Sequence, residues 1–73
     1  MKHIKIIQKI FNLNKKKING NDKVDEYNWD SMAKINLINA VDDKFSKTLD
    51  HKKIEKIIYI KDIDELIKKI ADK

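Results

Sequence analysis

The stretch that most constrains the fold begins at Ser31 and continues to residue 47 without a glycine or a proline. Its apolar residues recur at intervals of three and four, the spacing of one face of an α-helix. The residues predicted to form its buried stripe are Leu37, Ile38, Val41 and Phe45. Two further apolar residues, Met32 and Ile35, fall outside that stripe. The pattern therefore predicts an amphipathic helix that keeps an exposed apolar pair close to Ser31.

Ser31 is the first residue of this predicted helix, and Asp30 precedes it. Either side chain could accept a backbone N–H at the helix start, an interaction that contributes about 1 kcal/mol. A carboxylate also suits the positive end of the helix dipole. Taken alone, Asp-Ser before a helix is typical of capping. A functional role for Ser31 therefore needs support from other parts of the sequence.

The remaining segments predict a small all-α domain. Helical spacing of apolar residues predicts a first helix over residues 2–13, a short third helix over about 51–57, and a fourth helix from Asp62 or a neighbour to Ala71. No period persists over residues 14–30, which we interpret as a long loop held to the core by Ile18, Val24, Tyr27 and Trp29. The sequence therefore predicts one domain, residues 1–73: a four-helix bundle with three main helices, a short third helix and a long loop between helices 1 and 2.

Composition argues against an enzyme. A chain of 73 residues has room for one compact core, and it contains no cysteine for a disulfide, a thiolate metal site or a thiol nucleophile. His3 and His51 lack metal-ligand spacing, and each is expected to be a solvated side chain. Asp42 and Asp43 are adjacent, so on a helix they diverge by about 100° and cannot easily flank one bond.

The charge of the chain leaves another possibility open. All 17 basic residues are lysines and the formal net charge is +5. A small basic helical module that binds nucleic acid through Lys15 to Lys17 is therefore the alternative hypothesis. Against it, the lysines are dispersed and arginine, which favours bidentate phosphate and base contacts, is absent. The basic first helix is expected to pack in the core rather than lie on a membrane, and no secretory signal or membrane span is predicted, so we expect a cytoplasmic protein.

A longer pattern carries a resemblance to a known family. Trp29-Asp30-Ser31-Met32 precedes Ile35-Asn36-Leu37-Ile38 and Ala40-Val41-Asp42-Asp43-Lys44-Phe45. This pattern resembles the acyl carrier proteins and related phosphopantetheine-binding carrier domains over essentially the full length. In that family Asp-Ser-Leu begins the second helix, and an acidic pair leads to an aromatic residue near its end. Residues 54–57 and 60–67 also look like the third helix and the fourth helix of the family.

The resemblance implies that Ser31 receives phosphopantetheine from coenzyme A, in a transfer made by a separate Mg-dependent phosphopantetheinyl transferase. The thiol of that covalent group would carry acyl or aminoacyl groups as thioesters between the enzymes of a fatty-acid, polysaccharide-modification or secondary-metabolite pathway. The carrier itself would catalyse nothing and is expected to be a monomer. Its partners would be the transferase, a loading enzyme and the downstream enzymes.

The resemblance also implies a face that partner enzymes read. Its residues would be Asp30, Met32, Ile35, Asn36, Asn39, Asp42 and Asp43. Family members are generally acidic, whereas this chain is basic and has Lys34 inside the helix. Because electrostatic complementarity mainly sets encounter rate and partner choice, this departure favours partners in a specialised pathway over those of general fatty-acid synthesis.

Overall fold

The computed structural model describes residues 2–11 and 18–71. It contains α1 (Ile4–Ile10), the 3₁₀-helix η1 (Val24–Tyr27), α2 (Ser31–Phe45), α3 (His51–Glu55) and α4 (Ile60–Ala71). Within these residues there is no strand, and the only β-type pairing is an isolated bridge between Lys23 and Tyr59. The prediction of an all-α bundle with a short third helix and a long first loop is confirmed.

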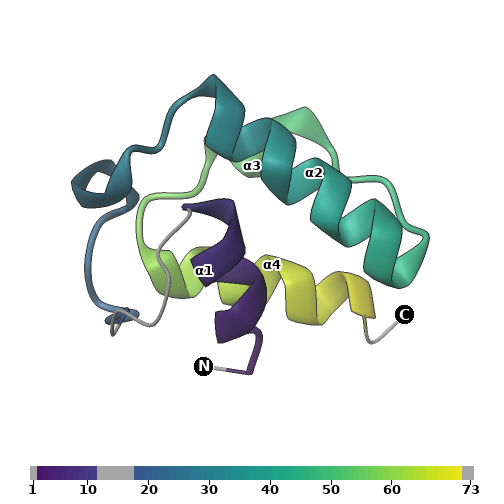
Figure 1. Ribbon diagram of the computed structural model, residues 1–73, viewed down its shortest axis with the longest axis horizontal. Coiled ribbons are helices and arrows are strands. Elements are labelled where there is room, and N and C mark those ends of the chain that lie inside the picture. Colours follow the sequence, from purple (N-terminus) through teal and green to yellow (C-terminus); the bar gives the residue numbers. More distant parts are fainter. Residues whose placement is uncertain (1, 12–17, 72–73) are drawn as a thin grey trace.

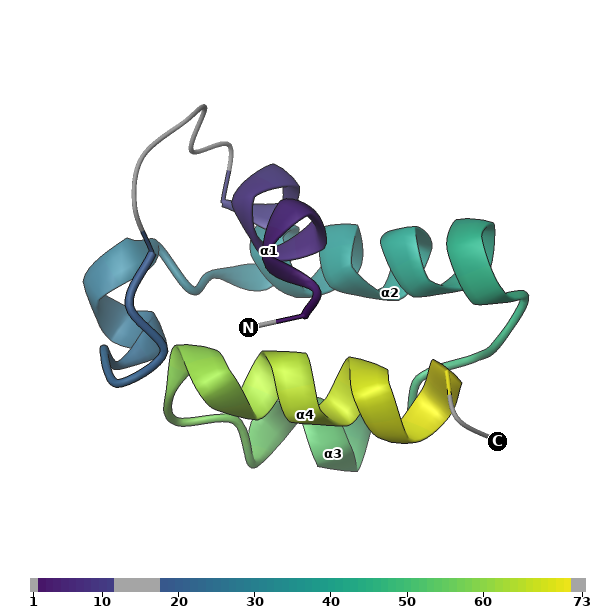
Figure 2. The ribbon, with the colours of Figure 1, turned by 90° about the horizontal axis from the view of Figure 1, so that it is seen from below.

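The helices form a bundle with one helix at each corner. α2 and α4 lie side by side and run in roughly the same direction, while α1 crosses them steeply (Figure 1). α1 packs against both α2 and α4, and α2 also packs against α4. α3 lies beside α4 on the side away from α1 (Figure 2). Both ends of α2 therefore remain at the surface of the molecule.

The core is built almost entirely from aliphatic side chains. Seven of them are fully buried, with 0 % exposure or close to it: Ile7, Leu37, Val41, Ile54, Ile60, Ile63 and Ile67. They come from all four α-helices, so each helix contributes apolar area to a single interior. Burial of that area is the main favourable term in folding such a chain.

The buried stripe of α2 differs from the predicted one at Ala33, Ile38 and Phe45. Ala33, Leu37 and Val41 are buried, whereas Ile38 and Phe45 are only partly buried. The buried residues are four apart and form a single ridge, the type of row that packs into the groove of a neighbouring helix. Ala33 was missed because a small side chain adds little to a hydrophobic pattern.

The boundaries of α1, α2 and α3 differ from the predicted ones. α1 covers Ile4–Ile10 rather than residues 2–13, and residue 13 lies outside the described residues. α2 ends at Phe45 because Ser46 adopts a left-handed conformation (φ 53°) and its N–H donates to the Asp42 carbonyl at 2.9 Å. α3 ends at Glu55, two residues earlier than predicted.

α4 begins at Ile60 rather than at Asp62. Asp62 is the third residue of α4, and its carboxylate accepts the N–H groups of Ile58 at 3.1 Å and Tyr59 at 2.9 Å. A carboxylate at the third position that reaches back to the preceding backbone is half of a capping box. The acidic helix-start signal in the sequence was correct, but it marks the third residue of the helix.

The long loop is held to the core as predicted. Ile18 and Val24 are buried, and Tyr27 and Trp29 pack partly buried against the core. Three backbone hydrogen bonds of 2.9–3.0 Å join the loop to the α3–α4 turn: Val24 N–H to the Ile58 carbonyl, Ile60 N–H to the Asp22 carbonyl, and Lys61 N–H to the Gly20 carbonyl. The helix η1 inside this loop was not predicted, because a single 3₁₀ turn carries no hydrophobic period.

The core assignment can be tested on α2 alone. We expect Leu37→Ala to lower the free energy of unfolding by about 2–5 kcal/mol, because it removes a fully buried side chain and leaves a cavity. Ile35→Ala, on the exposed face of the same helix, should cost less than about 1 kcal/mol. Urea denaturation followed by circular dichroism measures both, and equal losses would contradict the assignment.

Candidate functional site around Ser31

Asp30 caps the N-terminus of α2. It has extended backbone angles, and its Oδ1 accepts the Ala33 N–H at 2.9 Å. Its carbonyl accepts the Lys34 N–H at 3.2 Å, the first bond of the helix. The sequence leaves open whether Asp30 or Ser31 is the capping residue. In the structure the capping residue is Asp30.

Ser31 is the first residue of α2 and its side chain is exposed. Within the part of the chain that the structure describes, its hydroxyl makes no hydrogen bond. The hydroxyl is thus free of the capping function and open to solvent, beside the unsatisfied N–H groups of the first helical turn. The arrangement presents an accessible alcohol in the positive field of a helix N-terminus.

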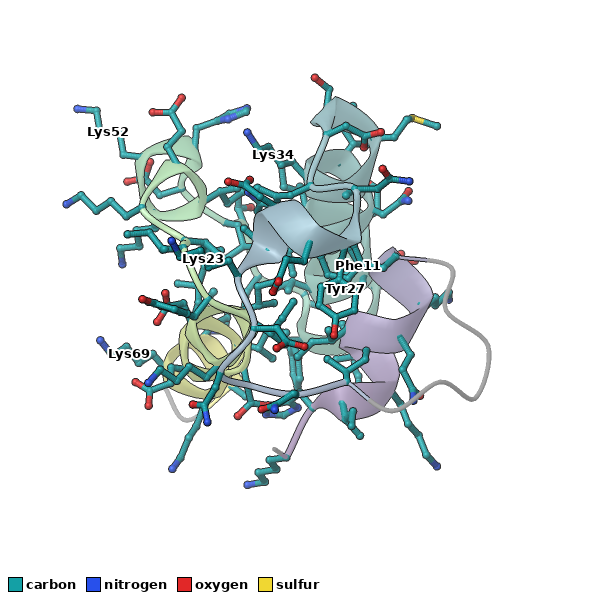
Figure 3. All side chains as sticks on the ribbon, turned by 90° about the vertical axis from the view of Figure 1, so that its left-hand side faces the viewer. Phe11, Lys23, Tyr27, Lys34, Lys52 and Lys69 are labelled. Atoms are coloured by element: carbon teal, nitrogen blue, oxygen red, sulfur yellow. The ribbon has the colours of Figure 1, made fainter. Side chains whose placement is uncertain are left out.

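A tight turn brings the chain into this position. Asn28 adopts a left-handed conformation (φ 57°), which asparagine tolerates better than most residues, and the Asp30 N–H donates to its carbonyl at 2.8 Å. Between them, the Trp29 ring packs against Phe11 at a centroid distance of 5.8 Å. Phe11 also contacts Tyr27 at 5.7 Å. These aromatic contacts attach the segment that precedes Ser31 to Phe11, at the C-terminal end of α1. Phe11 and Tyr27 are labelled in Figure 3.

Lys34 is the first charged residue of α2 after Ser31. Its Nζ lies 5.8 Å from the Trp29 ring centroid, a cation–π distance. On a helix, residues three apart are neighbours on the surface. A positive charge therefore lies on the Ser31 side of the first turn, a contact that sequence analysis did not predict because it depends on the fold of the preceding turn.

All residues of the predicted partner-reading face are exposed: Asp30, Met32, Ile35, Asn36, Asn39, Asp42 and Asp43. Met32 and Ile35 keep 65 % and 49 % of their surface in solvent, which is high for large apolar side chains. Three of the seven, Asn36, Asn39 and Asp43, line a hollow of about 220 Å³ together with Lys9, Ile10 and Ala40. The hollow lies between α1 and α2, and the other four residues do not line it.

The histidines do not form a site. His51 is exposed, as expected, whereas His3 is partly buried and its ring packs edge-on against Phe45 at 6.0 Å. The buried Nε2 of His3 has no hydrogen-bond partner, so the expectation of a solvated His3 is wrong. Among residues 2–11 and 18–71 no group of three His, Asp or Glu residues could hold a metal ion. Lys15 to Lys17, the predicted nucleic-acid contacts, lie outside the described residues.

No described helix has the length and apolar character needed to cross a bilayer. Comparisons of the chain with known protein families, curated proteins and solved structures find no match. The residues around Ser31, and the fold that positions them, are therefore the basis for inferring a function.

Tyr27, the last residue of η1, makes a short side-chain hydrogen bond. Its hydroxyl donates to Asp22 Oδ2 at 2.5 Å. This hydrogen bond, together with desolvation and the negative charge of Asp22, raises the pKa of Tyr27 above its usual value of 10.0. The bond ties Asp22, two residues before η1, to the last residue of η1.

The capping assignment gives the first test of the site. We expect Asp30→Ala to lower the free energy of unfolding by about 1 kcal/mol, because the Ala33 N–H loses its partner. Ser31→Ala should change it by less than about 0.5 kcal/mol, because the hydroxyl makes no such bond. Urea denaturation of both variants measures the difference, and a loss in Ser31→Ala as large as that in Asp30→Ala would mean that Ser31 shares the capping role.

The Tyr27–Asp22 bond predicts a pH dependence. Because the phenol holds its proton more tightly in the folded chain, stability from this bond is present below the unfolded pKa of about 10 and is lost as pH rises through the raised folded pKa. Ultraviolet titration, with Tyr27→Phe subtracted to remove Tyr59, should show the high pKa of Tyr27. In Asp22→Asn that pKa should fall, and an unchanged titration would contradict the assigned cause.

Proposed function

We propose that this chain is a carrier protein whose Ser31 hydroxyl is the attachment point for phosphopantetheine. The observation that carries the proposal is the exposed Ser31 Oγ, left without a hydrogen bond by the Asp30 cap, on the first residue of the second helix of a four-helix bundle. The motif resemblance points to the same residue. Because the Asp30 carboxylate already caps α2, capping does not require the Ser31 hydroxyl.

The residues around Ser31 fit a phosphodiester. Its oxygen is reachable from solvent, and a phosphate on it would lie beside the backbone N–H groups at the start of α2. An anion in that field gains about 0.3–1 kcal/mol. When attached, the group supplies a thiol that holds an acyl or aminoacyl group as a thioester. The chain has no cysteine that could compete with that thiol.

The chain supplies the nucleophile and a separate transferase supplies the base. Ser31 Oγ would form a bond to the phosphorus that carries pantetheine while the diphosphate linkage of coenzyme A breaks. The nucleoside bisphosphate half of coenzyme A would leave, and the hydroxyl proton would pass to the transferase. Asp30 is poorly suited to act as that base because its Oδ1 is engaged with the Ala33 N–H. Carrier and catalyst are thus different proteins in this scheme.

The outer face of α2 supports the assignment of partners to this site. Met32 and Ile35 offer apolar contact area within the first two turns, and Asp42 and Asp43 add negative charge near the far end. Asn36 and Asn39 between them are uncharged. Because charge pattern controls partner choice more than affinity, a face of this kind suits loading and downstream enzymes of one pathway, in fatty-acid synthesis, polysaccharide modification or secondary metabolism.

The chain offers a matched pair of serines for the test. Incubation with coenzyme A, Mg²⁺ and a broad-specificity phosphopantetheinyl transferase should add the mass of one phosphopantetheine group. Ser31→Ala should abolish the addition. Ser46→Ala, which changes the other serine of the chain just beyond the end of α2, should leave it complete. Intact-protein mass spectrometry reads out all three.

Two results would overturn the proposal. One is the absence of modification with several transferases of different specificity, on protein shown to be folded by circular dichroism. The other is a modification that persists in Ser31→Ala, which would place the attachment elsewhere.

A further inference from the structure

The turn between α3 and α4 leaves two large apolar side chains in solvent. Ile58 is 55 % exposed and Tyr59 is 36 % exposed, whereas Ile57 and Ile60 on either side are buried. Leaving an aliphatic and an aromatic side chain together at the surface forgoes the free energy of burying them. Neighbouring exposed apolar residues of this size are a feature of contact surfaces.

This exposure is fixed by the backbone of the turn. The Asp62 carboxylate holds the N–H groups of Ile58 and Tyr59, and the Ile58 carbonyl accepts the Val24 N–H. The turn is thus tied both to α4 and to the long loop. These hydrogen bonds hold the backbone of Ile58 and Tyr59 in the position that leaves their side chains exposed.

Three lysines surround the apolar pair. Lys23 is the antiparallel bridge partner of Tyr59, so their side chains emerge on the same face. Lys61 Nζ lies 5.5 Å from the Tyr59 ring centroid. Lys56, at the end of α3, is exposed two residues before Ile58. We refer to Lys23, Lys56, Ile58, Tyr59 and Lys61 as the lysine-framed turn.

More positive charge extends from this turn along α3 and α4. Lys52, Lys23 and Lys69 project on the side of the molecule away from α1 (Figure 3). Lys53, Lys56 and Lys69 line a hollow of about 270 Å³ whose apolar lining includes Ile57 and Leu66. Of the carboxylates in that hollow, Asp62 is engaged with backbone N–H groups and Glu65 is exposed. Among residues 2–11 and 18–71 no lysine is within ion-pair distance of a carboxylate.

We propose that the lysine-framed turn binds the surface of an anionic lipid bilayer. Lysine ammonium groups beside the turn would meet the lipid phosphates, to which their positive charge is attracted. Ile58 and the Tyr59 ring would enter the boundary between headgroups and acyl chains, where an aliphatic side chain and an amphipathic ring are both favourable. This binding does not depend on Ser31 or on the carrier function.

The chemistry of the turn favours lipid over nucleic acid. Lysine acts as a point charge and suits the diffuse charge of a bilayer, whereas base and phosphate recognition favours the bidentate arginine that this chain lacks. Ile58 gains from entering hydrocarbon but has no flat face on which a base could stack. α1 is a weaker candidate for lipid contact because Ile6, Ile7 and Ile10 are buried in the core.

The test uses the intact chain and sedimentation with large unilamellar vesicles. We expect binding to vesicles of equal parts phosphatidylcholine and phosphatidylglycerol, and none to phosphatidylcholine alone. Raising NaCl from about 50 mM to about 500 mM should release most of the protein, because salt screens the lysines. Ser31→Ala should bind as the unchanged chain does, which separates this proposal from the carrier proposal.

Substitutions locate the surface. The pair Lys23→Gln and Lys61→Gln should weaken binding about tenfold or more. The pair Lys5→Gln and Lys44→Gln, two exposed lysines outside the turn, removes the same charge and should have a much smaller effect. Ile58→Ser should weaken binding about fivefold or more, and Ile58→Leu should restore it. Circular dichroism confirms that each variant is folded.

Several results would overturn the proposal. These are no sedimentation with the anionic vesicles, equal sedimentation with both vesicle types, equal losses for the two lysine pairs, or full binding by Ile58→Ser. A further one is binding of a single-stranded oligonucleotide that depends on Lys23 and Lys61 while the vesicles stay unbound, which would assign the turn to nucleic acid.

Discussion

Burial of Leu37 and Val41 in the core that α2 shares with α1 and α4 decides which side of α2 faces solvent. Once that ridge is fixed, helical geometry places Ile35, Asn39 and the other outward residues on the opposite side. Ser31, at the helix start, stays exposed for the same reason. The candidate site is thus a consequence of core packing. The isoleucine-rich core fixes the orientation of α2 about its own axis, and this leaves the Ser31 hydroxyl and the side chains of Met32 and Ile35 exposed.

The sequence predicts the helices from the helical spacing of their apolar residues, and it fails where that spacing is absent. α2 and α4 were recognised from apolar residues three and four apart. η1 was missed because four residues make one 3₁₀ turn, and Ala33 was missed because its side chain contributes little to a pattern. The start of α4 was misplaced because an acidic residue can serve at the first or the third position of a helix, and only coordinates separate the two.

The candidate site was predictable in part. The position of Ser31 and the exposure of the predicted partner-reading face follow from the helical pattern. The assignment of the cap to Asp30 does not follow, because aspartate and serine have similar capping preference. The contacts of Trp29 with Phe11 and Lys34, the packing of His3 on Phe45 and the lysines around Tyr59 join residues distant in the chain or in neighbouring turns. Such contacts depend on tertiary structure, which a single sequence does not reveal.

The backbone pairing of the long loop with the α3–α4 turn has a consequence for cooperativity. The hydrogen-bond partners of Gly20, Asp22 and Val24 lie far along the chain, in residues 58–61. Forming any of these bonds therefore costs the conformational entropy of closing a long loop of chain. Only docking of α4 into the core offsets this cost. Local fraying of the first turn of α4 would therefore release the loop as well, and the two segments should open and close as a single unit.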